Sequence, residues 1–484
     1  MKKAHIKRNM FGAIAFLLLL TTTALTAQEK MFITTESNDA RTYFIDGREL
    51  MERFHLDDAS KKLENAINQD QNFAQAYLYL AFTKGGLSGI SQPYLIKAIE
   101  YAGTASPGEK HLIYLVKASK NKDSDEADRH ISALLELNPR DERIRTWVAW
   151  YYQNIKAYDK AKYHLRKAVT LNKEYHPAWN MLGYTHMEMG NMSMAEKAFN
   201  KYIELIPEEA NPYDSYAECM LRQGRFDESI KNYSKALTID PNFISSYLGR
   251  GDSYLFFGDF DKAKENYQTY YNKTNDIQGK LNALLLETSL EMQRNNISKA
   301  VEVMDRYIEL AEEQDMPFQK IYGTVYKGYI YAENDNTQKG LTYFQKVSDM
   351  IPNEKFDEKS RKRLQSQAQL WNMYGMAANN DIEDAEKICS KCEAEIAKSG
   401  LVDLWDMYHS MMGFLEIRKG NYNTAIEHLE EAIENPVTWY YTGLAWEKLG
   451  KPRKATKYYE KVANLYDNSF ELGTIRQKAM AGLE

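Results

Sequence analysis

The chain repeats itself with a period of 34 residues. Small residues recur at one position of this period, at Gly183, Ala217 and Gly251. Large apolar or aromatic residues recur at a second position, at Leu165, Phe199, Tyr233 and Tyr267. Five consecutive units, 108–141, 142–175, 176–209, 210–243 and 244–277, keep this phase without an insertion. A fixed period of this length predicts units that stack in a linear array, because each unit then makes the same contacts with its neighbours.

Each unit divides into two apolar-periodic halves of helical length. Ala195, Phe199 and Tyr202 share one helical face. A turn such as "MGN" at 189–191 separates the two halves, and Pro207 stands where the second helix must end. Small residues in the columns of Gly183 and Ala195 let the two helices approach closely. Each unit is therefore expected to be a helical hairpin that buries its apolar face by stacking on its neighbours.

The stretch "WNMLG" at 179–183, followed by small, aromatic and proline columns, resembles the tetratricopeptide repeat family. The same columns return outside the regular block, at 40–73, 321–354, about 406–435 and 436–469, and more weakly at 74–107, 281–314 and about 366–398. The resemblance covers roughly 40–469. It implies an all-α fold, an α-solenoid or right-handed superhelix of about twelve tetratricopeptide helical hairpins.

Loss of the repeat phase suggests how the chain is divided. The phase is lost at "NDIQGKL", "EQDMPFQ" and "NEKFDEKSRKRLQ", so the second half is expected either to bend there or to divide into two stacks. We expect a short N-terminal lead at 28–39, a regular array at 40–277, a less regular array at 278–469 and a helix at 470–484 that caps the end of the core.

The N-terminus has the pattern of an export signal. A basic segment at 2–8 precedes the apolar run "FGAIAFLLLL" and the small-residue stretch "TTTALTA". This pattern predicts a signal peptide at 1–27, with cleavage after Ala27, and a mature protein that is periplasmic or secreted. An uncleaved membrane anchor is the alternative. No cysteine near the cleavage site could carry a lipid, and no other segment approaches 18 consecutive apolar residues.

Composition excludes some functions. The net charge of −6 argues against nucleic-acid binding, which needs a basic surface. The sequence contains no phosphate-binding loop, serine-hydrolase elbow, zinc-protease motif or calcium loop, and we expect no cofactor. The 35 tyrosines are unusual, but several occupy packing columns, at Tyr233, Tyr267, Tyr270, Tyr307 and Tyr459.

Cys389 and Cys392 form a C-x-x-C pair. They occupy the columns that hold Phe199 and Tyr202 in the regular block, so helix packing is the preferred interpretation. An oxidisable pair and half of a metal site remain open, although a zinc site would need two more ligands. Cys219 lies inside a regular unit and is expected to be buried.

The family resemblance implies that the first helices of the hairpins line a concave groove that binds peptides or partner proteins. One groove-facing column would hold Trp150, Tyr184, Glu218 and Asp252, and a neighbouring column Thr146, Asn180, Asp214 and Leu248. Of these, the predicted partner-binding residues are Trp150, Asn180, Tyr184, Asp214, Glu218 and Asp252. Aromatic residues beside acids would suit a segment with basic or polar groups. Because Glu218 and Asp252 lie outside the packing columns, charge reversal there is expected to weaken binding and to leave the fold intact.

The sequence thus predicts a non-enzymatic scaffold for protein–protein interaction. An exported glycan- or small-ligand-binding protein built on the same hairpins is the first alternative, and an enzyme is the second. The lysine and asparagine set with which some family members hold a terminal carboxylate is not visible in the groove columns, so no partner of that kind is expected.

Overall fold

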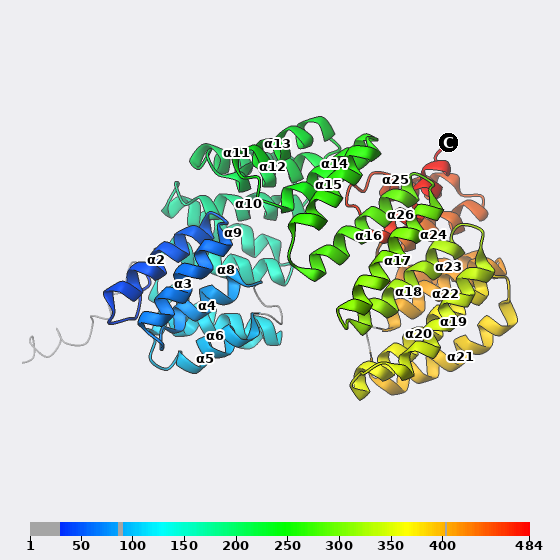
Figure 1. Ribbon diagram of the computed structural model, residues 1–484, viewed down its shortest axis with the longest axis horizontal. Helices are drawn as coiled ribbons and strands as arrows, with labels where there is room; N and C mark the ends of the chain where they lie inside the picture. The colour runs from blue at the N-terminus through cyan, green and yellow to red at the C-terminus, as the bar shows by residue number, and fades with distance from the viewer. Residues whose placement is uncertain (1–29, 86–90, 402–403) are drawn as a thin grey trace, which may run out of the picture. The chain divides into compact units, whose positions relative to one another are not determined.

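A computed structural model describes residues 30–85, 91–401 and 404–484. These residues form twenty-five α-helices, α2 to α26, and contain no strand (Figure 1). The leader expected at 1–27 lies outside the described residues. No helix within the described ranges is long and apolar enough to cross a membrane.

Twenty-four of the described helices pair into twelve consecutive hairpins, as the repeat pattern predicted, and α26 (Phe470–Ala481) follows the last pair. The first helices are α2 (Asn38–Glu52), α4 (Ala74–Thr83), α6 (Pro107–Asn121), α8 (Glu142–Asn154), α10 (His176–Glu188), α12 (Ala210–Arg222), α14 (Ser245–Phe257), α16 (Ile277–Gln293), α18 (Pro317–Ala332), α20 (Glu358–Ala378), α22 (Leu404–Lys419) and α24 (Pro436–Lys448). The second helices are α3 (Leu56–Gln69), α5 (Gln92–Tyr101), α7 (Ser124–Leu137), α9 (Tyr158–Leu171), α11 (Met192–Leu205), α13 (Phe226–Ile239), α15 (Phe260–Lys273), α17 (Ile297–Glu313), α19 (Thr337–Met350), α21 (Ile382–Ser399), α23 (Tyr422–Glu431) and α25 (Pro452–Ala463). A 3-10 turn, η1 (Ile351–Asn353), follows α19.

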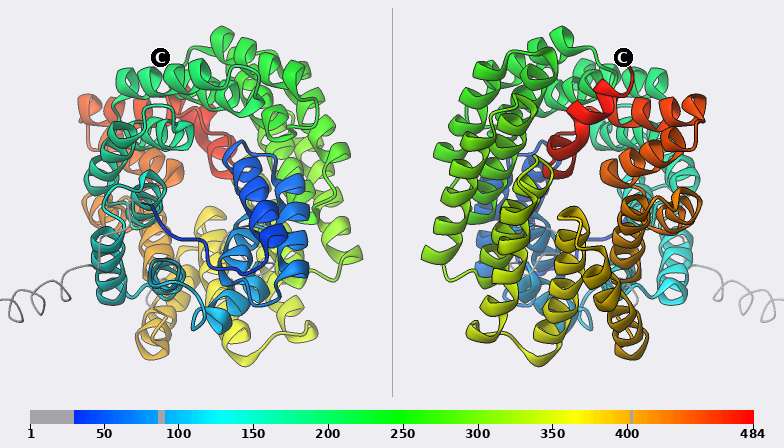
Figure 2. Two further views of the ribbon diagram at one scale, coloured as in Figure 1. Left: turned by 90° about the vertical axis from the view of Figure 1, so that its left-hand side faces the viewer. Right: turned by 90° about the vertical axis from the view of Figure 1, so that its right-hand side faces the viewer.

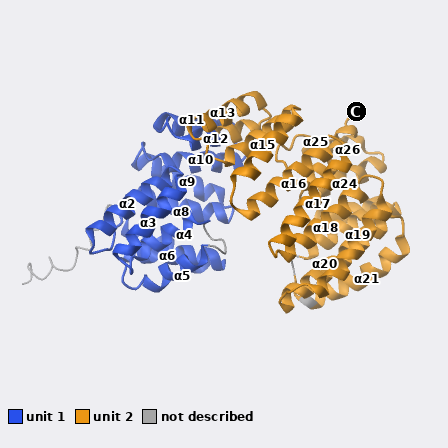
Figure 3. Ribbon diagram, viewed as in Figure 1, with its two compact units in different colours: residues 1–215 blue, residues 216–484 orange. Residues whose placement is uncertain are grey.

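The chain forms two compact units, Met1–Ser215 and Tyr216–Glu484, here called unit 1 and unit 2 (Figure 3). The division lies inside α12, between two residues of a regular repeat. The repeat phase is lost farther along the chain, after 277. Loss of phase and division into compact units are therefore separate features of this array.

A glycine in the first helix and a large side chain in the second hold the hairpins together. A Cβ atom on Gly183 would lie 2.4 Å from Cε1 of Phe199, which is closer than two unbonded carbons can approach. The same relation, sixteen residues apart in the sequence, recurs at Gly47 and Leu63, Gly251 and Tyr267, Gly328 and Phe344, Gly413 and Leu429, and Gly443 and Tyr459. The spacing is fixed because each large side chain covers the glycine backbone of its own hairpin.

Glycine has a different role in the turns. Gly190 and Gly224 adopt φ angles of 72° and 70°, a left-handed conformation that is costly for residues with a Cβ atom. Both sit directly after a first helix and reverse the chain toward the second. The sequence therefore uses glycine for close packing inside the hairpin and for backbone reversal at its tip.

The packing columns are buried as the pattern predicted, except at Tyr270, which is only half-buried. In unit 1, Phe199 and Tyr202 have no exposed surface, and in unit 2 the same is true of Tyr267. Tyr233, Tyr307 and Tyr459 are also buried. Each hairpin thus contributes side chains to a core shared with its neighbours, which is where the stability of a solenoid arises.

The C-terminal helix α26 does more than cover the end of the array. It packs against α25 and α24, as expected for a cap, and it also packs extensively against α16 (Figure 2). In the segment before it, the buried side chain of Asn468 accepts a hydrogen bond from Oγ of Ser289 at 2.6 Å and donates one to the hydroxyl of Tyr267 at 3.0 Å. The last residues of the chain therefore connect the two ends of unit 2.

An extended lead, described from residue 30, precedes α2 and is fixed to unit 1. The backbone N–H of Met31 donates to the Asp141 carboxylate at 2.8 Å, and that of Thr34 donates to Glu109 at 3.0 Å. Both acids lie at the N-terminal ends of first helices, α8 and α6. These contacts hold the lead against the N-terminal ends of α6 and α8.

Candidate functional site

Unit 1 contains a cavity of about 190 Å³ between first helices. Its lining comes mainly from α2, α4, α8 and α10, and comprises Met51, Glu52, Phe54, Tyr79, Phe82, Arg143, Thr146, Trp147, Trp150, Tyr175, Pro177, Asn180 and Met181. We call it the unit 1 cavity. Trp150 and Asn180, two of the six predicted groove residues, line it, and so does Thr146 from the neighbouring column.

Aromatic rings give the unit 1 cavity a rigid wall. The ring of Phe82 meets Trp147 and Trp150 edge-on, with centroids 4.7 and 5.3 Å apart. The indole N–H of Trp147 donates to the hydroxyl of Tyr79 at 3.2 Å, which fixes the orientation of both rings. Edge-to-face packing of this kind favours one arrangement of the side chains, so the wall is formed before any partner arrives.

A half-buried ion pair forms another part of the lining. Nε of Arg143 lies 2.8 Å from the Glu52 carboxylate, and the hydroxyl of Tyr175 donates to the same oxygen at 3.2 Å. Burial alone would lower the pKa of Arg143, but the Glu52 charge outweighs it and the pKa lies above its usual range. The arginine therefore stays charged and neutralises the only carboxylate among the described lining residues.

Asn180 carries unused hydrogen-bonding capacity. Its side chain is 5% exposed, and its Oδ1 atom has no hydrogen-bond partner among the described residues. A buried amide oxygen without a donor is unfavourable by about 1–3 kcal/mol. A bound group that brings an N–H or O–H to this wall would recover that free energy.

Tyr184 and Asp214 do not line the unit 1 cavity. The hydroxyl of Tyr184 donates to Oγ of Ser215 at 3.3 Å, and its ring packs edge-on against Phe199. Asp214 is half-buried on α12. Their predicted role in partner binding therefore stays a prediction, separate from the cavity.

Glu218 and Asp252 lie in unit 2, where each acid has an intramolecular partner. Glu218 pairs with Arg222 one helical turn later, at 2.9 Å. Asp252 accepts a hydrogen bond from the buried hydroxyl of Tyr267 at 2.6 Å, and that hydroxyl also receives the Asn468 amide. The expectation that charge reversal at Asp252 leaves the fold intact is therefore wrong, because a lysine there would meet a buried tyrosine and the C-terminal segment.

Asp252 makes the stability of unit 2 depend on pH. Burial raises the pKa of Asp252 to about 7, which outweighs the hydrogen bond from Tyr267. The folded state then holds a proton that the unfolded state releases near pH 4, so stability is lost as the pH rises from about 4 to 7. We expect Asp252→Asn to be more stable than the parent by about 2–4 kcal/mol at pH 8 and equally stable below pH 4.

Urea denaturation of both proteins across pH 4–8 measures this difference. Asn keeps an oxygen that can accept the Tyr267 hydroxyl, so the comparison isolates the charge. Glu430→Gln, an exposed acid of α23, is the control and should show no such trend. A constant difference between Asp252→Asn and the parent at every pH would contradict the assignment.

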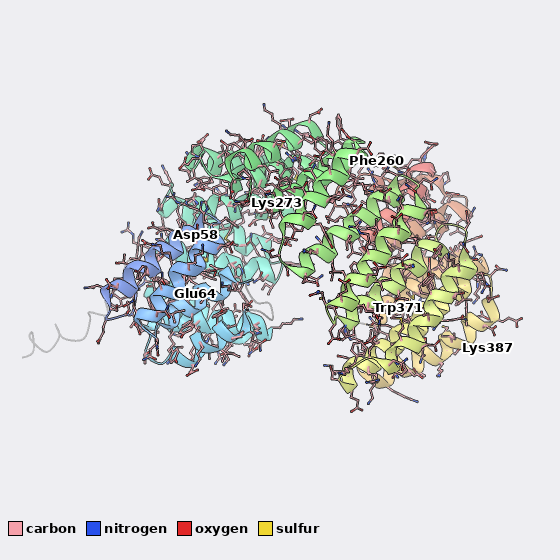
Figure 4. All side chains as sticks on the ribbon, viewed as in Figure 1. Asp58, Glu64, Phe260, Lys273, Trp371 and Lys387 are labelled. Carbon is pink, nitrogen blue, oxygen red and sulfur yellow. The ribbon has the colours of Figure 1, made fainter. Side chains whose placement is uncertain are left out.

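Unit 2 contains a larger cavity, of about 410 Å³, which we call the unit 2 cavity. It is lined by the first helices α18, α20, α22 and α24, by α26, and by the loop between α23 and α24. The lining residues are Tyr322, Val325, Tyr326, Tyr329, Glu333, Gln367, Trp371, Tyr374, Asp406, Met407, Ser410, Met411, Phe414, Ile433, Asn435, Val437, Tyr441, Phe470, Glu471 and Thr474. Figure 4 labels Trp371 on the first helix α20 and Lys387 on the second helix α21, where it projects at the edge of the unit. Most of the lining residues thus lie on first helices, and the rest come from α26, from the loop before α24 and from the position after α18.

One carboxylate joins the helices around the unit 2 cavity. Glu333, whose side chain is 7% exposed, accepts hydrogen bonds from the hydroxyls of Tyr374 and Tyr441 and pairs with Lys478 of α26. Burial, and then the nearby Glu333 charge, raise the pKa of both tyrosines well above the usual value. The tyrosines therefore remain neutral donors, and the cluster ties α20, α24 and α26 to the end of α18.

The unit 2 cavity was not predicted from the sequence, since none of its lining residues is among the six predicted groove residues. A usable signal was present: the position after the repeat glycine, which holds Tyr184, also holds Tyr329 after Gly328 and Phe414 after Gly413. Glu333 could not have been found in this way, since it follows the end of α18 and is one of many acids.

The cysteines pack in the core. Cys389 and Cys392 of α21 are buried and form no disulfide with each other, and Cys219 in α12 is buried as well. Burial raises the pKa of the Cys389 thiol, and it raises that of Cys392 to about 12. Both thiols are therefore neutral at physiological pH, which makes them poor nucleophiles. No group of His, Cys, Asp and Glu that could hold a metal is found in the described part of the chain.

If Cys389 and Cys392 only pack, replacing both with Ala should lower the free energy of unfolding by about 1–2 kcal/mol, through lost contacts in a partly relaxed cavity. Urea denaturation tests this. Ser390→Ala, on the exposed face of the same helix, should change little. Stoichiometric zinc in the purified protein, absent from the double variant, would contradict the packing role.

Comparisons with known proteins agree with the hairpin architecture. Models of the tetratricopeptide repeat match residues 176–209, 244–272 and 438–469, and a further TPR repeat model matches 221–255. The tetratricopeptide repeat-containing protein trd-1 of Caenorhabditis elegans is 26% identical over 184 residues, 36% of this chain. The chain spans 22% of the length of that relative.

Solved structures resemble parts of the chain. MamA is 24% identical and matches 33% of this chain over 93% of its own, with a TM-score of 0.30. The type IV pilus biogenesis factor PilW is 18% identical, with 41% and 91% covered and a TM-score of 0.37. YrrB, described as a TPR protein with an unusual peptide-binding site, is 17% identical, with 46% and 96% covered and a TM-score of 0.29. The repeat matches and the described hairpins together show that the chain contains tetratricopeptide repeats.

Proposed function

We propose that the protein is a non-enzymatic scaffold that binds an extended segment of a partner protein on the first helices of unit 1. The tetratricopeptide fold is one that supports protein interaction in general. Binding on the first helices of unit 1 is supported by the unit 1 cavity, in which Trp150 belongs to a preformed aromatic wall and Asn180 offers an acceptor without a donor. Aromatic residues around a partly enclosed pocket commonly dominate the free energy of binding.

The lining indicates the chemistry of the bound segment. Glu52 is neutralised by Arg143, so the cavity does not select a basic side chain. Its volume of about 190 Å³ and its aromatic wall suit one large apolar side chain. A neighbouring backbone N–H of the partner would then supply the donor that Asn180 lacks. An apolar anchor thus replaces the basic group that the acidic groove column suggested.

Trp150→Ala should weaken partner binding about tenfold or more, since it removes part of the wall on which an apolar anchor would pack. Peptides selected on the full-length parent from a random library provide the ligands, and fluorescence anisotropy measures the dissociation constants. Trp179→Ala is the matched control, because Trp179 lies on α10, outside the cavity lining, with its N–H donated to the backbone of Lys173.

Selected peptides that bind Trp150→Ala as tightly as the parent would place binding elsewhere. The variant must also melt like the parent for the comparison to hold, and Asn180→Ala supplies a second, smaller change in the same wall. A loss shared by Trp150→Ala and Asn180→Ala, and absent from Trp179→Ala, is the expected pattern.

We further propose that the protein acts outside the cytoplasm, in the periplasm or after secretion. The basic, apolar and small-residue segments of 1–27 support this. The intact mass of the protein isolated from its native cells tests it: a chain beginning at Gln28 is expected, and a chain that retains 1–27 would contradict cleavage.

A further inference from the structure

The unit 2 cavity combines aromatic rings with carboxylates. Eight of its lining residues are Tyr, Trp or Phe, and three are carboxylates, Glu333, Asp406 and Glu471. None of the described lining residues is Lys, Arg or His. Lys478 compensates the charge of Glu333, so Asp406 and Glu471 supply the net negative charge of the lining, and the faces of the rings add to the attraction for a cation.

The aromatic rings are held in place by one another. Tyr326 packs on Phe470 with centroids 4.3 Å apart, and Tyr374 packs on Phe414 at 4.6 Å. Phe414 in turn meets Tyr441 at 5.0 Å. The hydroxyls of Tyr374 and Tyr441 are fixed by Glu333. These contacts prevent collapse of the rings onto each other, so the space between them is preserved for a ligand.

The three acids differ in what they can offer a ligand. Glu333 already has two hydroxyl donors and an ammonium partner. Asp406, half-buried on α22, and Glu471, exposed on α26, have no hydrogen-bond or ion-pair partner for their carboxylates among the described residues. An ammonium group in the cavity would therefore find two carboxylates that no other charged group of the described residues already occupies.

We propose that the unit 2 cavity binds a small organic cation, an ammonium group joined to an apolar body. The apolar body would pack among the rings, and the ammonium group would be drawn to Asp406 and Glu471. The volume of about 410 Å³ lies in the range of small-molecule sites and exceeds what one peptide side chain fills. This function is independent of the scaffold role proposed for unit 1.

The C-terminal helix is part of this site. Phe470, Glu471 and Thr474 of α26 line the cavity, and Lys478 of the same helix holds Glu333. A ligand in the cavity would contact α26 and the first helices together. Occupancy should therefore slow hydrogen exchange in α26, an effect that a cation bound at an exposed acid elsewhere would not produce.

The test compares 2-phenylethylamine with 2-phenylethanol, which has nearly the same shape and no charge. Isothermal titration calorimetry on the full-length protein should show the amine binding about tenfold more tightly than the alcohol. The double variant Asp406→Asn and Glu471→Gln should bind both compounds equally, at the level of the alcohol. Both carboxylates lie in the first turn of a helix, where a negative charge is mildly stabilising, so their neutralisation should lower the melting temperature only slightly.

The matched control is Asp349→Asn with Glu430→Gln, two exposed acids of α19 and α23 outside the lining, which should keep the preference for the amine. Equal binding of amine and alcohol by the parent, no binding of the amine by the folded protein at millimolar concentration, or an unchanged preference in the Asp406 and Glu471 variant would each overturn the proposal. Binding of a lysine-containing peptide in the cavity, without binding of the amine, would also overturn the proposal.

Discussion

Glu333→Gln is expected to lower the free energy of unfolding of the C-terminal hairpins by about 3 kcal/mol. The parent carboxylate accepts from Tyr374 and Tyr441 and compensates the charge of Lys478. Glutamine keeps the size of the side chain, but it replaces one acceptor oxygen with a donor and leaves the lysine unpaired. The two tyrosine hydroxyls and the lysine ammonium group would then share a single amide oxygen as acceptor.

Urea denaturation, combined with hydrogen exchange of α24 and α26, measures this change. Glu312→Gln is the matched control: Glu312 also pairs with a lysine, Lys320, but its side chain is 65% exposed. An exposed pair of this kind contributes less than about 1 kcal/mol. Equal effects of the two substitutions would show that the Glu333 cluster does not hold α26 in place.

Gly183→Ala is expected to destabilise unit 1 by about 2 kcal/mol, even though alanine favours the helix more than glycine does. The added methyl would stand 2.4 Å from one carbon of Phe199 and 2.6 Å from the next. A second change, Phe199→Leu, should recover at least half of this loss. It recreates the pair that the preceding repeat already uses, Ala149 with Leu165, both fully buried.

Thermal and urea denaturation of the single and double variants measure the coupling between the two positions. Gly103→Ala is the control, because a Cβ atom at Gly103 would have no neighbour within 4 Å. It should be neutral or slightly stabilising, through the unfolded state. A Gly183→Ala protein as stable as the parent would mean that the two helices are not in the close contact that the repeat glycine allows.

The repeat pattern predicted the hairpins because the contacts that form them are local. Gly183 and Phe199 meet within one unit, and each unit repeats the arrangement of the last, so 34-residue periodicity contains the relevant information. The family resemblance, carried along the same columns, placed Trp150 and Asn180 on the groove side of the first helices, and both line the unit 1 cavity.

Contacts that join distant parts of the sequence could not be predicted in this way. Asn468 reaches Tyr267 across about 200 residues, and this contact turns Asp252 from a predicted groove acid into an internal carboxyl. Glu333 and Lys478 likewise meet only because α26 packs against the array. No period relates such pairs, because Asn468 stands at the end of the last repeat, after its second helix, and Lys478 lies beyond it. The unit 2 cavity depends on α26 and was missed for the same reason.

The central claim is that the first helices of unit 1 bind a partner segment, and hydrogen–deuterium exchange of the complex with a selected peptide tests it most directly. We expect slowed exchange in α8 and α10, around Trp150 and Asn180, and unchanged exchange in the second helices α9 and α11. Protection confined to α9 and α11, with α8 and α10 exchanging as in the free protein, would contradict it.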